Sequence, residues 1–283
     1  MKRIVIILLI ITGLYFIFQQ SLRFDWFSAG SREGSAAISG DVRVIKVDVS
    51  AVNADIIPED RMNLKAVLDG KGKMTVNEDG DTVEVTVKKK WFDWFDWTPF
   101  EKKTLKVYIP ETYQQDMEID LGSGNLEFSG KSMKLDKLSV DIGSGNMNLD
   151  NLTVNHFIHD GSSGNVHIDS LTSKTGTFDL SSGNLDIQHY IGKIDGDVSS
   201  GRAKIQVDKL TDSIDLDLSS GNVNLNLPND ADFVLDGEVS SGNISCDFPL
   251  KSKEFSRKSI KGTHGTGEHM INLSVSSGNI DIH

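Results

Sequence analysis

Apolar and polar residues alternate along most of the chain, and the same short motif, Ser-Ser-Gly-Asn or a close variant, interrupts the alternation again and again. The stretches "DLSSGNLDI" (179–187) and "DLSSGNVNL" (217–225) show the alternation on both sides of the motif. Alternation with a period of two is typical of a β-strand with one buried face. The sequence therefore predicts two short strands that meet at each motif.

The motif recurs eight times, and all but the last interval are 18 to 21 residues long. Serine precedes the glycine in every copy, and asparagine follows it in all copies except one, where Arg202 stands instead. A repeat of about twenty residues is typical of a stacked array such as a solenoid. The last interval is 36 residues, which predicts an inserted loop or a degenerate turn there. The motif glycines are Gly124, Gly145, Gly164, Gly183, Gly201, Gly221, Gly242 and Gly278.

These glycines are predicted to be structural corners at which the chain turns while its apolar face stays inward. Glycine adopts positive φ without strain, and asparagine tolerates the left-handed region better than most residues. Stacked coils would then place like residues about 4.8 Å apart, so that the asparagines form an amide ladder. A hairpin turn at each motif, giving a meander or a sandwich, is the alternative. The inward positions are the same in every copy and length varies only between motifs, which favours a parallel β-solenoid.

Four residues before the glycine, six copies carry aspartate. Stacked carboxylates repel one another, so these side chains are expected either in solvent, bonded to corner amides, or around cations. The aspartates lack the nonapeptide spacing of calcium-binding β-rolls, which favours the metal-free interpretation. We therefore predict no cofactor and no metal site, with a calcium column as the alternative. The column consists of Asp120, Asp141, Asp160, Asp179, Asp197 and Asp217.

The region before the first full motif is predicted to cap the solenoid. "DVSAVNADI" (48–56) aligns as a degenerate copy in which Val52 replaces the glycine, and it is expected to open the fold. Strand-like runs and turn signals follow it. Residues 41–115 are thus predicted as an N-terminal β cap with a degenerate first repeat, and residues 116–283 as the repeat solenoid. The fold class is all-β, a parallel β-helix-like solenoid of about eight to nine coils.

The first residues predict one transmembrane helix before this domain. Residues 4–22 are uncharged and follow Lys2 and Arg3, which gives a length of about 28 Å as a helix. No pair of small residues suits signal cleavage, because Phe27 stands where a small residue is needed. We predict an uncleaved single-pass anchor at 4–22, a cytoplasmic stub at 1–3, a linker at 23–40, and an exported domain after it.

An aromatic cluster, "WFDWFDWTPF" (91–100), interrupts the strand pattern of the predicted cap. One interpretation is a loop folded over the cap core. The other is an exposed patch that contacts the membrane or a partner protein. The candidate contact residues are Trp91, Phe92, Trp94, Phe95 and Trp97.

Composition narrows the function classes. The net charge is −12, which argues against nucleic acid and anionic lipid as electrostatic partners. Cys246 is the only cysteine, so no disulfide can form within the chain. No catalytic residues are predicted, because the carboxylates repeat in every coil instead of forming a unique pair.

The histidines and the two cations near a motif offer only weak sites. His159 is expected to point inward and His167 outward, so a shared metal is not predicted. "HGTGEH" (264–269) contains glycines that preclude a zinc-binding helix. Arg202 and Lys204 are expected to relieve the charge of the aspartate column, with a carbohydrate-binding cleft as the alternative.

The basic-flanked apolar N-terminus, the stretch "LKVYIPETYQQDMEIDLGSGNLEF" (105–128) and the serial motifs together resemble the bacterial putative-adhesin repeat family, a domain of unknown function. The resemblance covers about residues 40–283 and implies a location at the cell surface, without established catalytic or ligand residues. The expected function is a non-enzymatic binding, sensing or scaffold protein, anchored in the membrane of the bacterial cell envelope and linked to envelope stress. Its partner would be an envelope component or a membrane protein. The alternatives are a carbohydrate-active β-helix enzyme and a calcium-stabilised adhesive stalk.

Overall fold

A computed structural model of the chain describes residues 32–70, 72–88, 103–130 and 132–283. In this part the regular elements are seventeen β-strands, and they belong to one compact unit, Arg32–His283. No helix in the described ranges has the length and apolar character needed to cross a membrane. The predicted anchor at 4–22 lies outside the described residues, so it stays a prediction.

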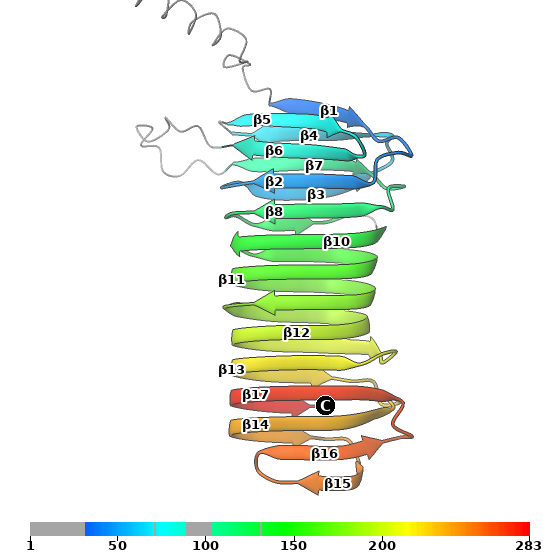
Figure 1. Cartoon of the computed structure of the whole chain (residues 1–283), viewed down its shortest axis with the longest axis vertical. Helices are drawn as coiled ribbons and strands as arrows, with labels where there is room; N and C mark the ends of the chain where they lie inside the picture. The colour runs from blue at the N-terminus through cyan, green and yellow to red at the C-terminus, as the bar shows by residue number, and fades with distance from the viewer. Residues whose placement is uncertain (1–31, 71, 89–102, 131) are drawn as a thin grey trace, which may run out of the picture. The chain divides into compact units, whose positions relative to one another are not determined.

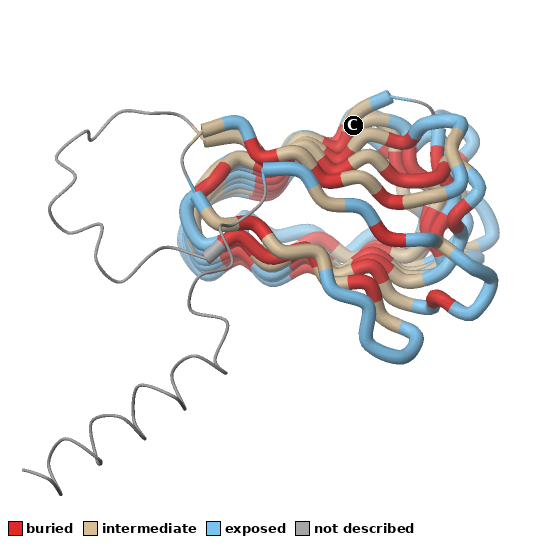
Figure 2. Tube along the Cα trace, turned by 90° about the horizontal axis from the view of Figure 1, so that it is seen from above, coloured by how far each residue is buried: buried red, intermediate tan, exposed pale blue. Residues whose placement is uncertain are grey.

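Each regular coil of the unit has two strands that meet at the motif. We call the strands that run toward the motif the entry layer and the strands that leave it the exit layer. In the Gly201 coil, Ile194 and Val198 of the entry layer and Ile205 of the exit layer are fully buried. Viewed along the stack, the two layers face each other and the buried residues line the space between them (Figure 2). The predicted inward columns are therefore confirmed.

The coils stack as parallel strands, as the solenoid prediction requires (Figure 1). Gly164 pairs with Gly183, and Gly201 pairs with Gly221, both in parallel register. The hairpin alternative is wrong for these motifs, because the strands on the two sides of a corner pair with neighbouring coils. Ladder pairing continues around several corners, so some strands run through one or two of them. These strands are β11 (Met147–Leu180), β12 (Gly183–Lys209) and β13 (Ile214–Asn226), whereas β10 (Met133–Ser144) ends just before the Gly145 corner.

The degenerate copy forms a coil in the register that the sequence suggested. Asp48 pairs with Asp120 and Ile56 pairs with Phe128, so Val52 takes the place of the corner glycine. This coil does not open the stack, however, because a coil formed later in the sequence lies outside it. From the outside inward, the three coils are β6 (Thr82–Lys88) with β7 (Thr104–Pro110), β2 (Val44–Val49) with β3 (Asn53–Glu59), and β8 (Asp116–Leu121) with β9 (Leu126–Phe128).

Antiparallel strands close the N-terminal end of the stack. β5 pairs with β6, β4 pairs with β7, and β1 pairs with β4. Figure 2 shows β1 crossing the end of the stack above the core. Ala36 of β1 is 4% exposed, so this strand shields the apolar side chains beneath it. The bounds are β1 (Glu33–Ala37), β4 (Asn63–Asp69) and β5 (Lys73–Asp79).

The C-terminal end combines a hairpin with a change in coil order. β15 and β16 form an antiparallel hairpin beside β14, and β17 lies between β13 and β14. Every residue of β15 is exposed, and three of its five residues are charged. Charged edge strands discourage pairing with other chains. The bounds are β14 (Phe233–Cys246), β15 (Lys251–Phe255), β16 (Ser259–His264) and β17 (His269–Ile282).

Candidate functional site: the corner and its flanking columns

All eight motif glycines have φ between +131° and +150°, a backbone conformation that favours glycine. A second constraint was not visible in the sequence. A Cβ built on Gly183 would overlap the carbonyl oxygen of Gly164 in the next coil, and the other corners repeat this contact. Val52 is not among the positive-φ residues, so the degenerate corner is built differently.

The motif asparagines form the predicted amide ladder on the outer side of the corner. The Nδ2 group of Asn165 donates to Oδ1 of Asn146 at 3.0 Å, and Asn184 Nδ2 donates to Asn165 Oδ1 at 2.7 Å. The backbone N–H of Asn125 donates to Oδ1 of Asn53 at 3.0 Å, so the ladder extends to the degenerate copy. Each link supplies a hydrogen bond without any ligand.

Arg202 interrupts the ladder between Asn184 and Asn222. Its side chain is exposed and forms no ion pair within the described part of the chain. Lys204 Nζ lies 3.9 Å from Oδ1 of Asp186, an exit-layer residue, and not beside the aspartate column. Within the described residues neither side chain forms an ion pair with the aspartate column, so the expected charge relief of that column is not observed there.

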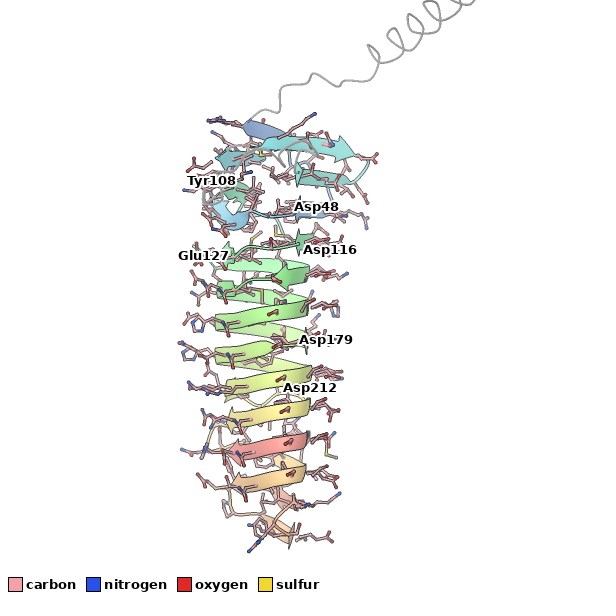
Figure 3. All side chains as sticks on the ribbon, turned by 90° about the vertical axis from the view of Figure 1, so that its left-hand side faces the viewer. Asp48, Tyr108, Asp116, Glu127, Asp179 and Asp212 are labelled. Carbon is pink, nitrogen blue, oxygen red and sulfur yellow. The ribbon has the colours of Figure 1, made fainter. Side chains whose placement is uncertain are left out.

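The aspartates stack in register on the outer face of the entry layer. Asp141 pairs with Asp160, and Asp179 pairs with Asp197. The spacing between neighbouring strands places consecutive carboxylates about 4.8 Å apart. Figure 3 places Asp48 and Asp179 on one side of the stack, opposite Glu127 and Tyr108 on the exit side.

The column is solvated and acidic. Partial burial is the largest cause that raises the pKa of Asp141, and the charges of Asp120 and Asp160 raise it further. The pKa of Asp179 is raised in the same way, by burial first and then by Asp160 and Asp197. No corner amide within the described ranges donates to these carboxylates, so of the two metal-free alternatives the structure supports the solvated one.

The exit layer contrasts with this column because its outward charges are mixed. His167 Nδ1 lies 3.8 Å from Oδ2 of Asp186, and Asn148 Nδ2 donates to Oε2 of Glu127 at 3.0 Å. Opposite or neutral partners thus alternate along the stack on this side. The two faces of the solenoid therefore differ in charge, and the acidic face borders the corner on the entry side.

His159 points into the core, as predicted, while His167 points outward. His159 is 2% exposed and its Nδ1 lies 3.2 Å from the carbonyl oxygen of Val140. Its ring fills space beside Gly161, where most other copies carry a larger apolar residue. Burial lowers the pKa of His159 to about 4, so the imidazole is neutral at neutral pH.

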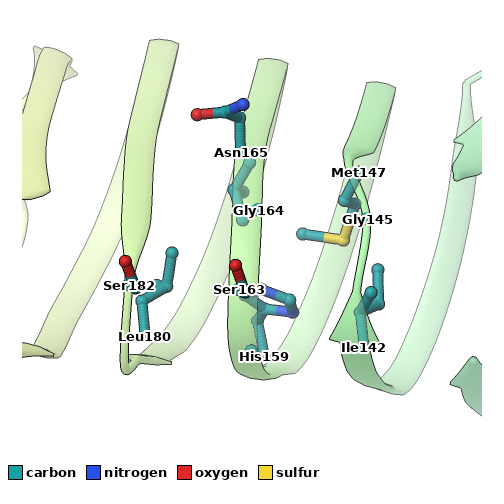
Figure 4. Close-up of a pocket in the computed structure, with 11 residues that line it drawn as sticks. Ile142, Gly145, Met147, His159, Ser163, Gly164, Asn165, Leu180 and Ser182 are labelled. Atoms are coloured by element: carbon teal, nitrogen blue, oxygen red, sulfur yellow. The ribbon is translucent and has the colours of Figure 1, made fainter. Parts of the chain in front are cut away.

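A cavity of about 10 Å³ lies beside this histidine in the Gly164 coil, and residues of the Gly145 and Gly183 coils also line it (Figure 4). Ile142, Met147 and Leu180 contribute apolar walls. A water molecule needs about this volume, so the cavity has no room for a larger ligand. It provides neither a substrate pocket nor a catalytic cleft.

"HGTGEH" forms the turn between β16 and β17. Asp232 accepts hydrogen bonds from the N–H of Thr266 and Glu268 at 2.9 Å, from Thr266 Oγ1 at 2.7 Å, and from the N–H of Gly267. These bonds lower the pKa of Asp232, with the hydroxyl of Thr266 as the largest cause. His264 Nδ1 lies 3.1 Å from the carbonyl oxygen of Pro249. The segment is thus a hydrogen-bonded turn.

Nowhere in the described ranges do three or more His, Cys, Asp or Glu side chains gather as a metal site. The aromatic residues Trp91, Phe92, Trp94, Phe95 and Trp97 lie outside the described residues. They connect β6 to β7 in the sequence, where other coils carry the corner motif.

Comparison with known proteins gives the following similarities. The profile of the Toastrack family, DUF4097, matches residues 42–283. A structure described as a putative adhesin from Parabacteroides distasonis is 12% identical, with a TM-score of 0.49, covering 90% of this chain and 98% of that one. One from Bacteroides fragilis, also described as a putative adhesin, is 12% identical, with a TM-score of 0.49 and coverage of 89% and 96%. Among curated proteins, none matches.

Proposed function

Because the chain belongs to the Toastrack family, whose profile matches most of its length, we propose that it is a non-enzymatic binding or scaffold protein of the bacterial cell envelope. The observation that carries this proposal is the uniformity of the stack. Each corner presents the same serine, glycine and asparagine, with Arg202 as the exception. An enzyme needs a unique constellation of groups beside a substrate cavity, and the described residues form only repeating columns there.

The repeated surface suits an extended partner better than a small molecule. Columns of like side chains run along the stack at a spacing of about 4.8 Å. A polymer or a protein can contact many coils at once and add weak contacts along its length.

The function test separates binding from carbohydrate cleavage. Membranes that contain the full chain are incubated with purified cell-wall sacculi, and both the retained protein and the soluble sugar fragments are measured. Retention without release of fragments is expected from a binding protein. Release of soluble fragments with new reducing ends would contradict the proposal and support a carbohydrate-active enzyme.

The proposed location is the outer side of the cytoplasmic membrane. The basic Lys2 and Arg3 before the apolar residues 4–22 support an anchor that exports everything after it. Protease added to spheroplasts is expected to digest the domain and to spare a tag placed before residue 1. A soluble form that begins near Gly30 would refute the anchor.

The proposed physiological setting is envelope stress. The order of basic residues, apolar segment and serial motifs resembles LiaG, the membrane-anchored member of the family encoded in the lia cell-envelope-stress operon of bacilli. Crosslinking in intact cells, before and after treatment with an antibiotic that blocks wall synthesis, tests this setting. The crosslinked partner is expected to be an envelope polymer or membrane protein, with a yield that changes on treatment. An unchanged yield argues against a role in stress.

A further inference from the structure

The last coil along the chain is not the last coil of the stack. Gly278 of β17 pairs with Gly221 of β13 on one side and with Gly242 of β14 on the other. The chain therefore skips one coil position after β13, builds β14 and the β15–β16 hairpin, and fills the skipped position with its final residues (Figure 1). We call the position between β13 and β14 the insertion slot.

β17 joins the C-terminal end to the rest of the stack. The residue-level pairings of β14 within the described ranges are with β16 and β17, so β13 and β14 meet through β17. Ile271, Leu273 and Ile280 of β17 are at most 2% exposed. An empty slot would leave two unpaired strand edges and would expose apolar side chains to water. The slot therefore requires an occupant with this sequence pattern.

The occupant is attached to its own chain through a single turn. Residues 265–268 connect β16 to β17. Gly265 and Gly267 have φ of +69° and +83°, and Asp232 holds the turn with the hydrogen bonds described above. The closed turn thus depends on one carboxylate, which is contributed by the segment before β14.

We propose that the insertion slot is an interaction surface for a second copy of this chain, and that two copies exchange β17 reciprocally. The exchanged segment has the same sequence, so it makes the same strand pairs and the same buried contacts in the partner's slot as in its own. Only the 265–268 turn changes, because it opens into a hinge between the two copies. Asp232 stabilises the closed turn and therefore opposes exchange. This inference does not depend on the proposed function.

The register of the slot supplies a direct test. Cys246 of β14 pairs with Ile282 of β17. Ile282 is fully buried and Cys246 is half-buried at the equivalent position of its coil. Neighbouring strands bring the Cα atoms within the range that a disulfide spans. A full-length tagged chain with Ile282→Cys and Cys246→Ser cannot form this bond within itself, whereas it can form one with Cys246 of an untagged natural chain.

The two full-length chains are mixed in detergent, incubated just below the melting temperature, cooled and oxidised. A disulfide between them forms only when β17 of the tagged chain occupies the slot of the untagged chain. We expect a minor crosslinked fraction with the natural turn. The crosslinked fraction should increase at least about tenfold when both chains carry Asp232→Ala, which corresponds to about 1.4 kcal/mol or more of lost turn stability. Asp230→Ala in the same loop is the matched control and should leave the fraction unchanged.

A second hinge variant covers the case in which Asp232→Ala does not fold. Deletion of Thr266 and Gly267 shortens the turn so that β17 cannot reach the slot of its own chain, and exchanged dimers are expected. No crosslink with the natural turn and none with Asp232→Ala, while both proteins stay folded, would overturn the proposal. A folded monomer from the deletion variant would overturn it as well.

Discussion

Replacing a corner glycine by alanine tests why the motif is repeated. Gly183 lies in the middle of the stack with φ of +143°, and a Cβ there would overlap the carbonyl oxygen of Gly164. Gly80 also has positive φ, +61°, but nothing lies within 4 Å of a Cβ built on it. The pair Gly183→Ala and Gly80→Ala therefore separates close approach between coils from backbone conformation alone.

The magnitudes follow from these two geometries. Gly80→Ala places alanine in the left-handed region, which costs about 1–2 kcal/mol. Gly183→Ala costs about 1–3 kcal/mol for a backbone conformation that non-glycine residues rarely adopt. Pushing the two coils apart adds about 1–3 kcal/mol, as overpacking does elsewhere. We expect a total of about 2–6 kcal/mol, which corresponds to a fall in melting temperature of roughly 5–20 °C for a domain of this size.

Hydrogen exchange locates the damage as well as its size. The overlap lies on the Gly164 side of Gly183, so amides of the Gly164 coil should lose more protection than those of the Gly201 coil. Coils interact mainly with their neighbours, so the distant Gly278 coil should keep its protection. If Gly183→Ala is no more harmful than Gly80→Ala, or if the loss is equal on both sides, the close-approach argument is wrong.

Three further predictions concern charge. The folded-state pKa of His159 is about 4, below the ordinary 6.5, so the free energy of unfolding should fall as pH drops from about 6.5 to 4. Urea unfolding at pH 7 and pH 4.5 measures this fall, and His159→Gln should make the fall smaller by about 2–3 kcal/mol. Because the pKa of Asp179 is raised, Asp179→Asn should stabilise the protein at pH 7 by less than about 1 kcal/mol, and added salt should reduce the gain; a lower melting temperature would contradict this. Chelating divalent ions should leave the melting temperature unchanged, whereas a large calcium-dependent rise would support a cation column.

The sequence predicts the coil well because the local pattern is redundant. Alternation fixes which residues face inward, and it places His159 in the core and His167 outside correctly. The register of Asp48 with Asp120 also follows from aligning a copy that lacks the glycine. In each case several positions of the same motif point to the same answer.

The same redundancy hides which coils are neighbours. Any copy with the motif can stack on any other, so the sequence cannot show that Gly278 lies between Gly221 and Gly242. The expected charge relief by Arg202 and Lys204 could not be judged from the sequence for another reason. Position in the motif gives the distance along the chain, but Arg202 and Lys204 follow the corner and Lys204 pairs with Asp186, an exit-layer residue, instead of an aspartate of the column.

The non-sequential coil order determines when the domain can finish folding. A ribosome makes β14 before β17, so the stack contains an unfilled position until the 14-residue strand β17 has been released. Contacts between segments far apart in sequence form slowly. The same holds at the N-terminal end, where β2 pairs with β6 and β8, which are both synthesised after it. A chain that ends prematurely lacks the strand that joins its last coil to the stack. Synthesis of β17 is thus a condition for a stable C-terminal end of the stack, and products truncated before it should be the preferred substrates of proteases.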